Sequence, residues 1–453
     1  MNGFVKYVIE NGGDEYDLFY SPRILEGKYC SCNTSCVWFN DELIINSRLV
    51  NYRKLFQSNE LKFIPENHAQ TYYYLKNGFD TRNVISRYTN GKLNNVIECK
   101  YPGENFWDVY YRGLEDCRLV NWNHRLYAYG TRWDRVKDKG CICIYELDDN
   151  FQPHNEIVIQ PQGCGNCEKN WGAVSDKPFT FVYLNNPVQV VEVNKFGDCW
   201  LVNEHPKNEN IKYQIKGSTQ VVRYDENTYI SLVHTNNWFK DGIIDRSDYL
   251  TAFAFYDNDF NLIKLSDWFV FRSPMCEFSC GLAVKDDDVY ITYSQLDCTS
   301  HLLITNKQTV EKFINLENDL NNTDTFIDVY SRAKEFEKNG QIISSYILYN
   351  YASLLYNNEP YFINFEVECL IKTYFNVIEQ QPHCRVSYFD DAAESLKKTI
   401  KKYQDCCEFY YLLSYLYKLS GNADEYSRYK QLGDERKLNI HNYFFNYLNP
   451  NYL

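Results

Sequence analysis

The sequence has no long hydrophobic run, no excess of basic residues and no compact framework of cysteines. No stretch of about 18 apolar residues occurs, so we predict neither a signal peptide nor a membrane span. The formal net charge of −13 excludes broad nucleic-acid binding, because that binding requires a basic surface. The 17 cysteines are an odd number and are scattered, so we expect reduced thiols and a cytoplasmic protein.

A split zinc site is the alternative use for some of these cysteines. Its ligands would come from Cys30-x-Cys32-x3-Cys36 and Cys164-x-x-Cys167, although the spacing of the first group suits zinc poorly. Cys141-x-Cys143 alternates within an apolar run, as strand residues on one face do. We favour free thiols, and no Asp-x-Asp motif of the usual nucleotide-sugar transferases stands out. We therefore predict no metal and no cofactor.

Aromatic residues, in contrast, are abundant at 17%, with 41 tyrosines. Aromatic side chains favour strands. They also suit sugar binding, because the apolar faces of sugars stack on rings. A codon bias towards an AT-rich genome explains the same excess equally well. Composition alone therefore leaves sugar binding open.

Residues 1–320 have the pattern of a β domain. Apolar and aromatic runs such as Leu126–Tyr129 and Val289–Tyr293 alternate with turn signals such as Asn90-Gly91 and Asn123-His124. Hairpins that recur over about 300 residues favour a propeller over a single sandwich. Five blades of about 60 residues would fill this span, although no strict repeat is visible.

The pattern changes near Asn318, and residues 321–453 have helical periodicity. Apolar residues follow i, i+3, i+4, i+7 spacing at Phe326, Val329, Tyr330, Ala333 and Phe336. Further helices are predicted near 343–352, 362–380, 391–404, 406–419 and 423–436. The helix pairs resemble tetratricopeptide-type arrays, and a plain bundle packed on the β domain is the alternative. We predict a mainly β chain, a five-bladed β-propeller (1–320) followed by an all-α domain of helical hairpins (321–453).

The stretch Gly113–Leu119 carries the strongest chemical signal. Glu115, Asp116 and Arg118 place two carboxylates and a guanidinium within four positions at the mouth of a strand. Such a group can bind sugar hydroxyls and handle a proton. Taken alone, a Glu-Asp-x-Arg sequence is better explained as a surface turn with a local ion pair. The chemical interpretation therefore depends on other stretches.

Several stretches, in order along the chain, resemble motifs of the five-bladed enzymes of glycoside hydrolase family 130. They also resemble the related β-1,2-mannosyltransferases of glycosyltransferase family 108. The stretches are Ser21–Ile24 with Asn46–Arg53, Gly113–Arg118, Glu168–Trp171, Lys216–Thr219 with His234, and Glu277–Leu282 with Tyr293 and Asp297. The resemblance covers about residues 15–305. It implies a carbohydrate-active enzyme that acts on mannose-like sugars.

The resemblance also implies roles for the matching residues. Asp116 corresponds to the general acid/base, with Glu115 and Arg118 orienting it and binding sugar hydroxyls. Arg48 and Asp297 resemble residues that hold the donor-side sugar. The remaining substrate-binding candidates are Asn51, Lys169, Asn170, Trp171, Lys216, His234, Tyr249 and Glu277. Lys169, Asn170 and Lys216 resemble the anion-binding side, and Trp171 is either a sugar platform or a buried core residue. Taken singly, Arg48 fits a strand ion pair, Asp297 a turn, and the lysines a solvated surface.

The sequence departs from the family pattern in three places. Cys117 follows Asp116 where the family has proline, and Ser21 stands where it has asparagine. The phosphorylases carry His-Arg before a proline in the third blade, where this chain reads Leu184-Asn185-Asn186-Pro187. Because that arginine binds phosphate in those enzymes, its loss disfavours phosphorolysis.

We therefore predict a glycosyltransferase-type enzyme that transfers a mannose-like hexose to a glycan acceptor with inversion. Its partners would be a nucleotide-sugar or sugar-phosphate donor and the glycan acceptor, and a protein partner could bind the C-terminal helices. One alternative is a β-mannoside phosphorylase or hydrolase. The other is a non-catalytic glycan-binding propeller whose helical tail binds a partner, although the carboxyl group of Asp116 would be wasted in a pure binder.

Overall fold

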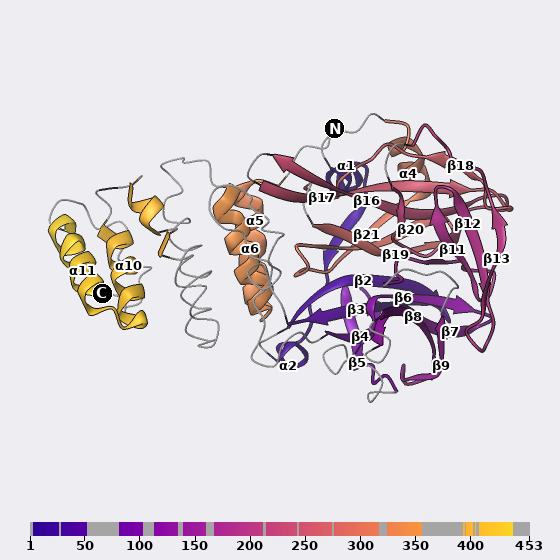
Figure 1. Cartoon of the computed structure of the whole chain (residues 1–453), viewed down its shortest axis with the longest axis horizontal. Helices are drawn as coiled ribbons and strands as arrows, with labels where there is room; N and C mark the ends of the chain where they lie inside the picture. The colour runs from indigo at the N-terminus through magenta and orange to yellow at the C-terminus, as the bar shows by residue number, and fades with distance from the viewer. Residues whose placement is uncertain are drawn as a thin grey trace.

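The structure is a computed structural model of the chain (Figure 1). It describes residues 3–26, 29–51, 81–102, 113–134, 139–159, 167–211, 214–241, 244–273, 276–316, 324–355, 393–394, 396–401, 404 and 407–437. Cys164, the end of the Asn46–Arg53 stretch and the helix predicted over 362–380 lie outside these residues.

The described strands form five separate antiparallel sheets, which are the blades of a propeller (Figure 1). Blade 1 contains β2 (Cys30–Phe39), β3 (Glu42–Val50), β4 (Thr81–Thr89) and β5 (Lys92–Glu98). Blade 2 contains β6 (Glu115–Trp122), β7 (Arg125–Asp134), β8 (Lys139–Leu147) and β9 (Pro153–Ile159). Blade 3 contains β10 (Gly172–Ala173), β11 (Thr180–Asn185), β12 (Val188–Val193) and β13 (Cys199–Glu204). Blade 4 contains β14 (Lys216–Gly217), β15 (Val222–Arg223), β16 (Tyr229–Asp241), β17 (Ile244–Tyr256) and β18 (Leu262–Leu265). Blade 5 contains β19 (Glu277–Lys285), β20 (Asp288–Gln295), β21 (His301–Asn306) and β1 (Asp14–Asp17). The predicted five-bladed propeller is confirmed.

Two-residue turns close several of these hairpins at the predicted signals. Asn90 and Gly91 join β4 to β5 with φ of +49° and +79°, and Asn123 and His124 join β6 to β7 with φ of +52° and +60°. Two successive left-handed residues form the type I′ turn, whose twist matches that of paired strands.

The last blade is completed by the N-terminal strand. Strand β1 pairs antiparallel with β21, from Asp14 opposite Ile304 to Asp17 opposite His301. Helix α1 (Phe4–Glu10) lies beside it, and the Phe4 ring packs 4.6 Å from that of Phe313 in α4 (Lys307–Phe313). Both ends of the propeller sequence therefore meet in one sheet, which closes the ring.

The first strands of the blades converge at the centre, as the contacts of Gln220 show. This side chain of blade 4 is buried. Its Nε2 donates to the carbonyls of Cys36 on β2, at 3.0 Å, and Leu119 on β6. Its Oε1 accepts from the Leu282 amide on β19 at 3.3 Å. One side chain thus joins four blades at the axis.

Aromatic rings fill the space between neighbouring blades. Trp122 of β6 packs 5.0 Å from Phe179 and 5.7 Å from Phe181 of blade 3, and its Nε1 donates to the Val174 carbonyl at 2.7 Å. Such contacts bury ring surface and satisfy the indole donor. At least part of the aromatic excess therefore serves the core.

Two C-terminal helices pack directly on the propeller. Helix α5 (Phe326–Lys338) begins with a capping box between Thr325 and Asp328, and α6 (Ile342–Leu355) follows it. The residues of the predicted apolar stripe, from Phe326 to Phe336, are all buried. They share one hydrophobic cluster with Cys30, Cys32, Val50, Leu296 and Cys298 of blades 1 and 5.

Helices α10 (Cys407–Ser420) and α11 (Ala423–Lys437) lie farther from the propeller (Figure 1). The predicted boundary near residue 320 lies outside the described residues, so the domain division, the resemblance to tetratricopeptide arrays and the protein partner stay predictions. No helix in the described part of the chain is long and apolar enough to cross a membrane.

Candidate functional site

The candidate site lies where the first strands of the blades begin. Asn33 lies near the start of β2, Asp116 near the start of β6, and Asn170 just before β10. Lys216 begins β14, and Phe278 is the second residue of β19. Because first strands run in the same sense around a propeller axis, their starting residues lie at one face.

Asp116 is the central carboxylate of this face. The β6–β7 register shifts between Glu115 and Arg118, and Asp116 has a left-handed φ of +49°. This bulge re-aims its side chain out of the regular alternation of the strand. Its Oδ1 accepts a hydrogen bond from Asn33 Nδ2 at 2.7 Å and lies 3.4 Å from Arg48 Nη1. The side chain is 11% exposed, so a bound molecule can reach it.

Two residues of blade 1 hold this carboxylate. Asn33 lies in a bulge of β2, and its Oδ1 accepts from Ser294 Oγ at 2.8 Å, which leaves Nδ2 directed at Asp116. Arg48 is buried on β3, where its Nε donates to Thr81 Oγ1 at 2.7 Å. Its Nη1 also lies 3.9 Å from Glu115 Oε1. The guanidinium is therefore close to both carboxylates.

Arg118 connects the acid to blades 3 and 4. Its Nε donates to the Ser218 carbonyl at 2.5 Å, and its Nη1 donates to the Asp116 carbonyl at 2.7 Å. Its Nη2 lies 3.5 Å from Asn170 Oδ1. These contacts make Arg118 a residue that positions the Asp116 backbone.

Basic groups lie beside the acids. Lys169 is exposed. The charge of Glu115 raises its pKa, the partial desolvation of the ammonium lowers it, and the charge of Asp116 raises it further. Burial lowers the pKa of Lys216, and the charge of Lys169 lowers it further. Lys169 is thus close enough to Lys216 for its charge to disfavour the Lys216 ammonium.

His234 lies next to Lys216, which it faces across the β14–β16 pairing. Its Nδ1 and Ser218 Oγ are 2.8 Å apart. Its ring stacks 5.8 Å from that of Tyr249 and meets the Phe278 ring edge-on at 5.0 Å. Burial lowers the pKa of His234 well below its ordinary value, with Lys216 the next cause, so the ring is neutral at pH 7.

Asp297 lies on the blade 5 side of the site. Its Oδ1 accepts from Cys276 Sγ at 3.6 Å, and its carbonyl accepts from Cys30 Sγ at 3.4 Å. Burial raises the pKa of the Cys32 thiol well above its ordinary value, and the charges of Asp297 and Asp116 raise it further. Cys32 therefore lies near both aspartates and pairs with Arg48 across β2 and β3. Asn51, which follows β3, is also buried.

Two of the substrate-binding candidates are buried, and Ser21, which replaces the family's asparagine, lies at the surface. Trp171 is 1% exposed, packs on Phe181 and Tyr183 and donates to Glu168, so it offers no face to a sugar. Glu277 is also 1% exposed, and its carboxylate accepts from the backbone amides of residues 271–273. Ser21 caps helix α2 (Pro22–Leu25) at the surface.

Sequence reasoning missed Asn33, Ser218 and Phe278 as members of the site. Asn33 follows Cys32 in a run where the cysteines drew attention, and its left-handed φ of +44° is apparent only from the bulge. Phe278 and Ser218 lie inside stretches that were identified, but their partners His234 and Arg118 are distant in sequence.

The described residues contain no group of three or more histidine, cysteine or acidic side chains placed to hold a metal ion. Cys141 and Cys143 lie on β8, as predicted, and both are buried. Cys30, Cys32 and Cys36 are buried cysteines, and Cys167 is an exposed one. The absence of a metal cofactor stays a prediction.

Comparisons with known proteins give similarities of structure only. No protein-family model and no curated protein sequence matches the chain. Solved structures similar to it include a mannose phosphorylase from Leishmania mexicana bound to phosphate, with 12% identity over 70% of this chain and 96% of that chain and a TM-score of 0.41. The β-1,2-mannobiose phosphorylase from Listeria innocua shares 10% identity over 67% and 100%, with a TM-score of 0.43. A glycosyl hydrolase from Bacteroides ovatus shares 11% identity over 68% and 95%, with a TM-score of 0.44. At this level of similarity none of them assigns a reaction to this chain.

Proposed function

We propose that the protein is an enzyme that cleaves β-mannosides with phosphate, and that Asp116 is its general acid. The observation that carries the proposal is the Asp116 carboxylate, held by Asn33 and Arg48, with Lys169 and Lys216 beside it in a single site. Inverting cleavage needs one carboxyl group near the bridging oxygen and a nucleophile from outside the protein. Phosphate is such a nucleophile, and two ammonium groups match its charge.

In this reaction the phosphate oxygen forms a bond to the anomeric carbon while the bond from that carbon to the bridging oxygen breaks. Asp116 supplies the proton that the departing sugar oxygen takes up. Asn33 and Arg48 orient the carboxylate, and Arg118 fixes its backbone. Lys169 and Lys216 would hold the phosphate, and Arg48, Asp297 and Glu115 would bind sugar hydroxyls.

Phosphorolysis replaces transfer from a nucleotide-sugar, which we predicted first from the sequence. That prediction relied on the missing His-Arg before Pro187. The neighbouring Asn185 is buried, and its side-chain amide lies close to Gly217, beside Lys216. Asn185 and Lys216 would then contribute to the anion site in place of that arginine.

The test is incubation with short β-mannosides, with and without inorganic phosphate, followed by product analysis. Mannose 1-phosphate that forms only with phosphate would support the proposal, and loss of product in Asp116→Asn would assign the acid. Free mannose in both conditions would show a hydrolase instead. Turnover of GDP-mannose alone would restore the transferase.

A further inference from the structure

The turn between β20 and β21 carries Asp297 and has an unusual backbone. Leu296 and Asp297 have φ of +58° and +52°, and a left-handed backbone is an outlier for a bulky residue such as leucine. Such a conformation persists only where the surroundings over-determine it, and it is typical of functional sites. The question is which groups hold this turn.

Several hydrogen bonds of the turn involve Gln295 or its neighbour, and the Asp297 carbonyl accepts from Cys30 Sγ at 3.4 Å. The Gln295 carbonyl accepts from the amides of Cys298 at 3.1 Å and Thr299 at 3.3 Å. The Leu296 amide donates to the Cys276 carbonyl at 2.7 Å. Gln295 is therefore the base on which the turn is built.

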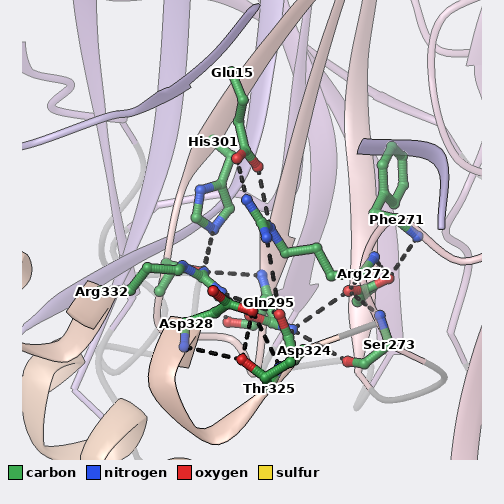
Figure 2. A network of polar contacts seen from close by, with 12 residues as sticks. Glu15, Phe271, Arg272, Ser273, Gln295, His301, Asp324, Thr325, Asp328 and Arg332 are labelled. Atoms are coloured by element: carbon green, nitrogen blue, oxygen red, sulfur yellow. Dashed lines mark hydrogen bonds and ion pairs between the residues drawn. The ribbon is translucent and has the colours of Figure 1, made fainter. Parts of the chain in front are cut away.

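The Gln295 side chain contacts Ser273 Oγ at 3.1 Å and Glu277 Oε1 of β19 at 3.4 Å, and it is also held by residues outside the propeller strands (Figure 2). Its Nε2 donates to Asp324 Oδ2 at 2.8 Å, and its Oε1 accepts from Arg332 Nη1 at 3.1 Å. Arg332 lies on α5, and its Nη1 is also 3.7 Å from Asp324 Oδ1. Gln295 is fully buried and Asp324 is 7% exposed, so solvent does not compete for these contacts.

Helix α6 holds the other side of the turn. Ser344 Oγ donates to the Cys298 carbonyl at 2.5 Å. Leu296 and Cys298 lie in the hydrophobic cluster that contains Val329, Ala333, Ile343 and Ile347 of the two helices. The turn that presents Asp297 is thus fixed by hydrogen bonds and packing from α5 and α6.

We infer that helices α5 and α6 are part of the sugar-binding site, with Asp324 and Arg332 as positioning residues for Asp297. The inference rests on the proposed function, because Asp297 would bind the sugar in that reaction. The helices thereby complete the fifth blade from outside, and their effect reaches the sugar side of the site rather than the lysines that would bind phosphate.

The test compares Arg332→Gln with Arg332→Lys, which keeps a donor for Gln295 and a charge for Asp324. Thr325→Ala is the matched control, because it removes the α5 capping box without touching Gln295. We expect Arg332→Gln to raise KM for the mannoside on the order of tenfold while KM for phosphate changes less than about twofold. Arg332→Lys should restore most of the affinity, and Thr325→Ala should lower Tm without moving either KM.

Hydrogen exchange of residues 296–299 supplies a readout that needs no turnover. Arg332→Gln should exchange faster than the wild type there, and Thr325→Ala should not. Ser344→Ala, a smaller change on α6, replaces Arg332→Gln if that variant does not fold. Unchanged exchange, or an equal rise of KM in Thr325→Ala, would overturn the inference. If Arg332→Gln exchanges faster at residues 296–299 but the wild-type protein turns over no mannoside, only the proposed function is refuted.

Discussion

At the residue scale, Asp116 lies among groups that other blades supply. Asp116→Asn keeps the size of the side chain and its hydrogen bond to Asn33, but it cannot donate a proton to a leaving group. We expect kcat/KM for a β-mannoside to fall by about 10²–10⁴-fold with Tm nearly unchanged. Steady-state kinetics and a melting curve measure both. Glu115→Gln is the control, since it should retain more activity; equal losses in the two variants would contradict a unique acid.

Lys216 is half-buried beside Lys169, so its charge would act at short range on a bound anion. Lys216→Met should raise KM for phosphate about tenfold or more and leave mannoside binding largely intact. Initial rates at varied phosphate test this. Lys195→Met removes an exposed lysine on a blade 3 turn and should change nothing. An unaltered KM for phosphate in Lys216→Met would take this lysine out of the site.

His234 links the site to folding stability through pH. Its pKa is lowered in the folded protein by burial, whereas the unfolded chain has a value near 6.5. Below about pH 6.5 the unfolded chain binds a proton that the folded one does not. The contribution of His234 to the free energy of unfolding is therefore present above that pH and is lost as the pH falls. The free energy of unfolding is measured with urea at pH 7.5 and at pH 5. Its drop between the two pH values should be up to about 2 kcal/mol smaller in His234→Asn than in the wild type. Identical pH dependence in both proteins would mean that folding does not lower the pKa of His234.

At the element scale, strand β1 closes the propeller through charge as well as pairing. Glu15 bonds to Arg272 and to Tyr293 Oη, and Arg272 Nη1 lies 3.8 Å from Asp324 (Figure 2). Glu15→Ala would leave a largely buried guanidinium with one carboxylate fewer, at a cost of about 3 kcal/mol in the free energy of unfolding. Asp14→Ala, on the exposed start of the same strand, should cost less than about 0.5 kcal/mol. Urea titrations of the two variants make the comparison, and similar losses would show that β1 closes the ring by backbone pairing alone.

The elements that sequence identified are those with local signals. The turns at Asn90-Gly91 and Asn123-His124, and the apolar stripe of α5, are contained in neighbouring residues, so period and turn chemistry were sufficient. The bulges that aim Asn33 and Asp116 could not be read from neighbouring residues, because each bulge depends on pairing with a second strand. The burial of Trp171 depends in the same way on Phe181 and Tyr183 of the same blade. The sequence therefore left open whether Trp171 is a sugar platform or a core residue.

At the scale of the whole molecule, the sequence left open whether the C-terminal helices form an array of their own or pack on the β domain, and α5 and α6 pack on it. The described strands end at Asn306 and α5 begins at Phe326, but periodicity does not report which faces meet. The apolar face of α5 covers Leu296 and Cys298 of blade 5 together with Cys30 and Cys32 of blade 1. The helices therefore pack over the junction of the first and last blades, where a propeller ring is joined.

Removing the helices should consequently damage the propeller itself. A chain that ends after residue 316 would lose Asp324 and Arg332 and would expose the surface of blades 1 and 5 that α5 and α6 cover. Burial of each large apolar side chain stabilises by about 1.5–3 kcal/mol, so the loss of several such contacts rivals the 5–15 kcal/mol stability of a typical domain. We expect the truncated chain to be insoluble or to melt far below the full chain, as judged by circular dichroism, and to have no activity on mannosides. A chain ending after residue 437 retains α5 and α6 and is the control. Full turnover by residues 1–316 would show that the propeller is complete without its helices.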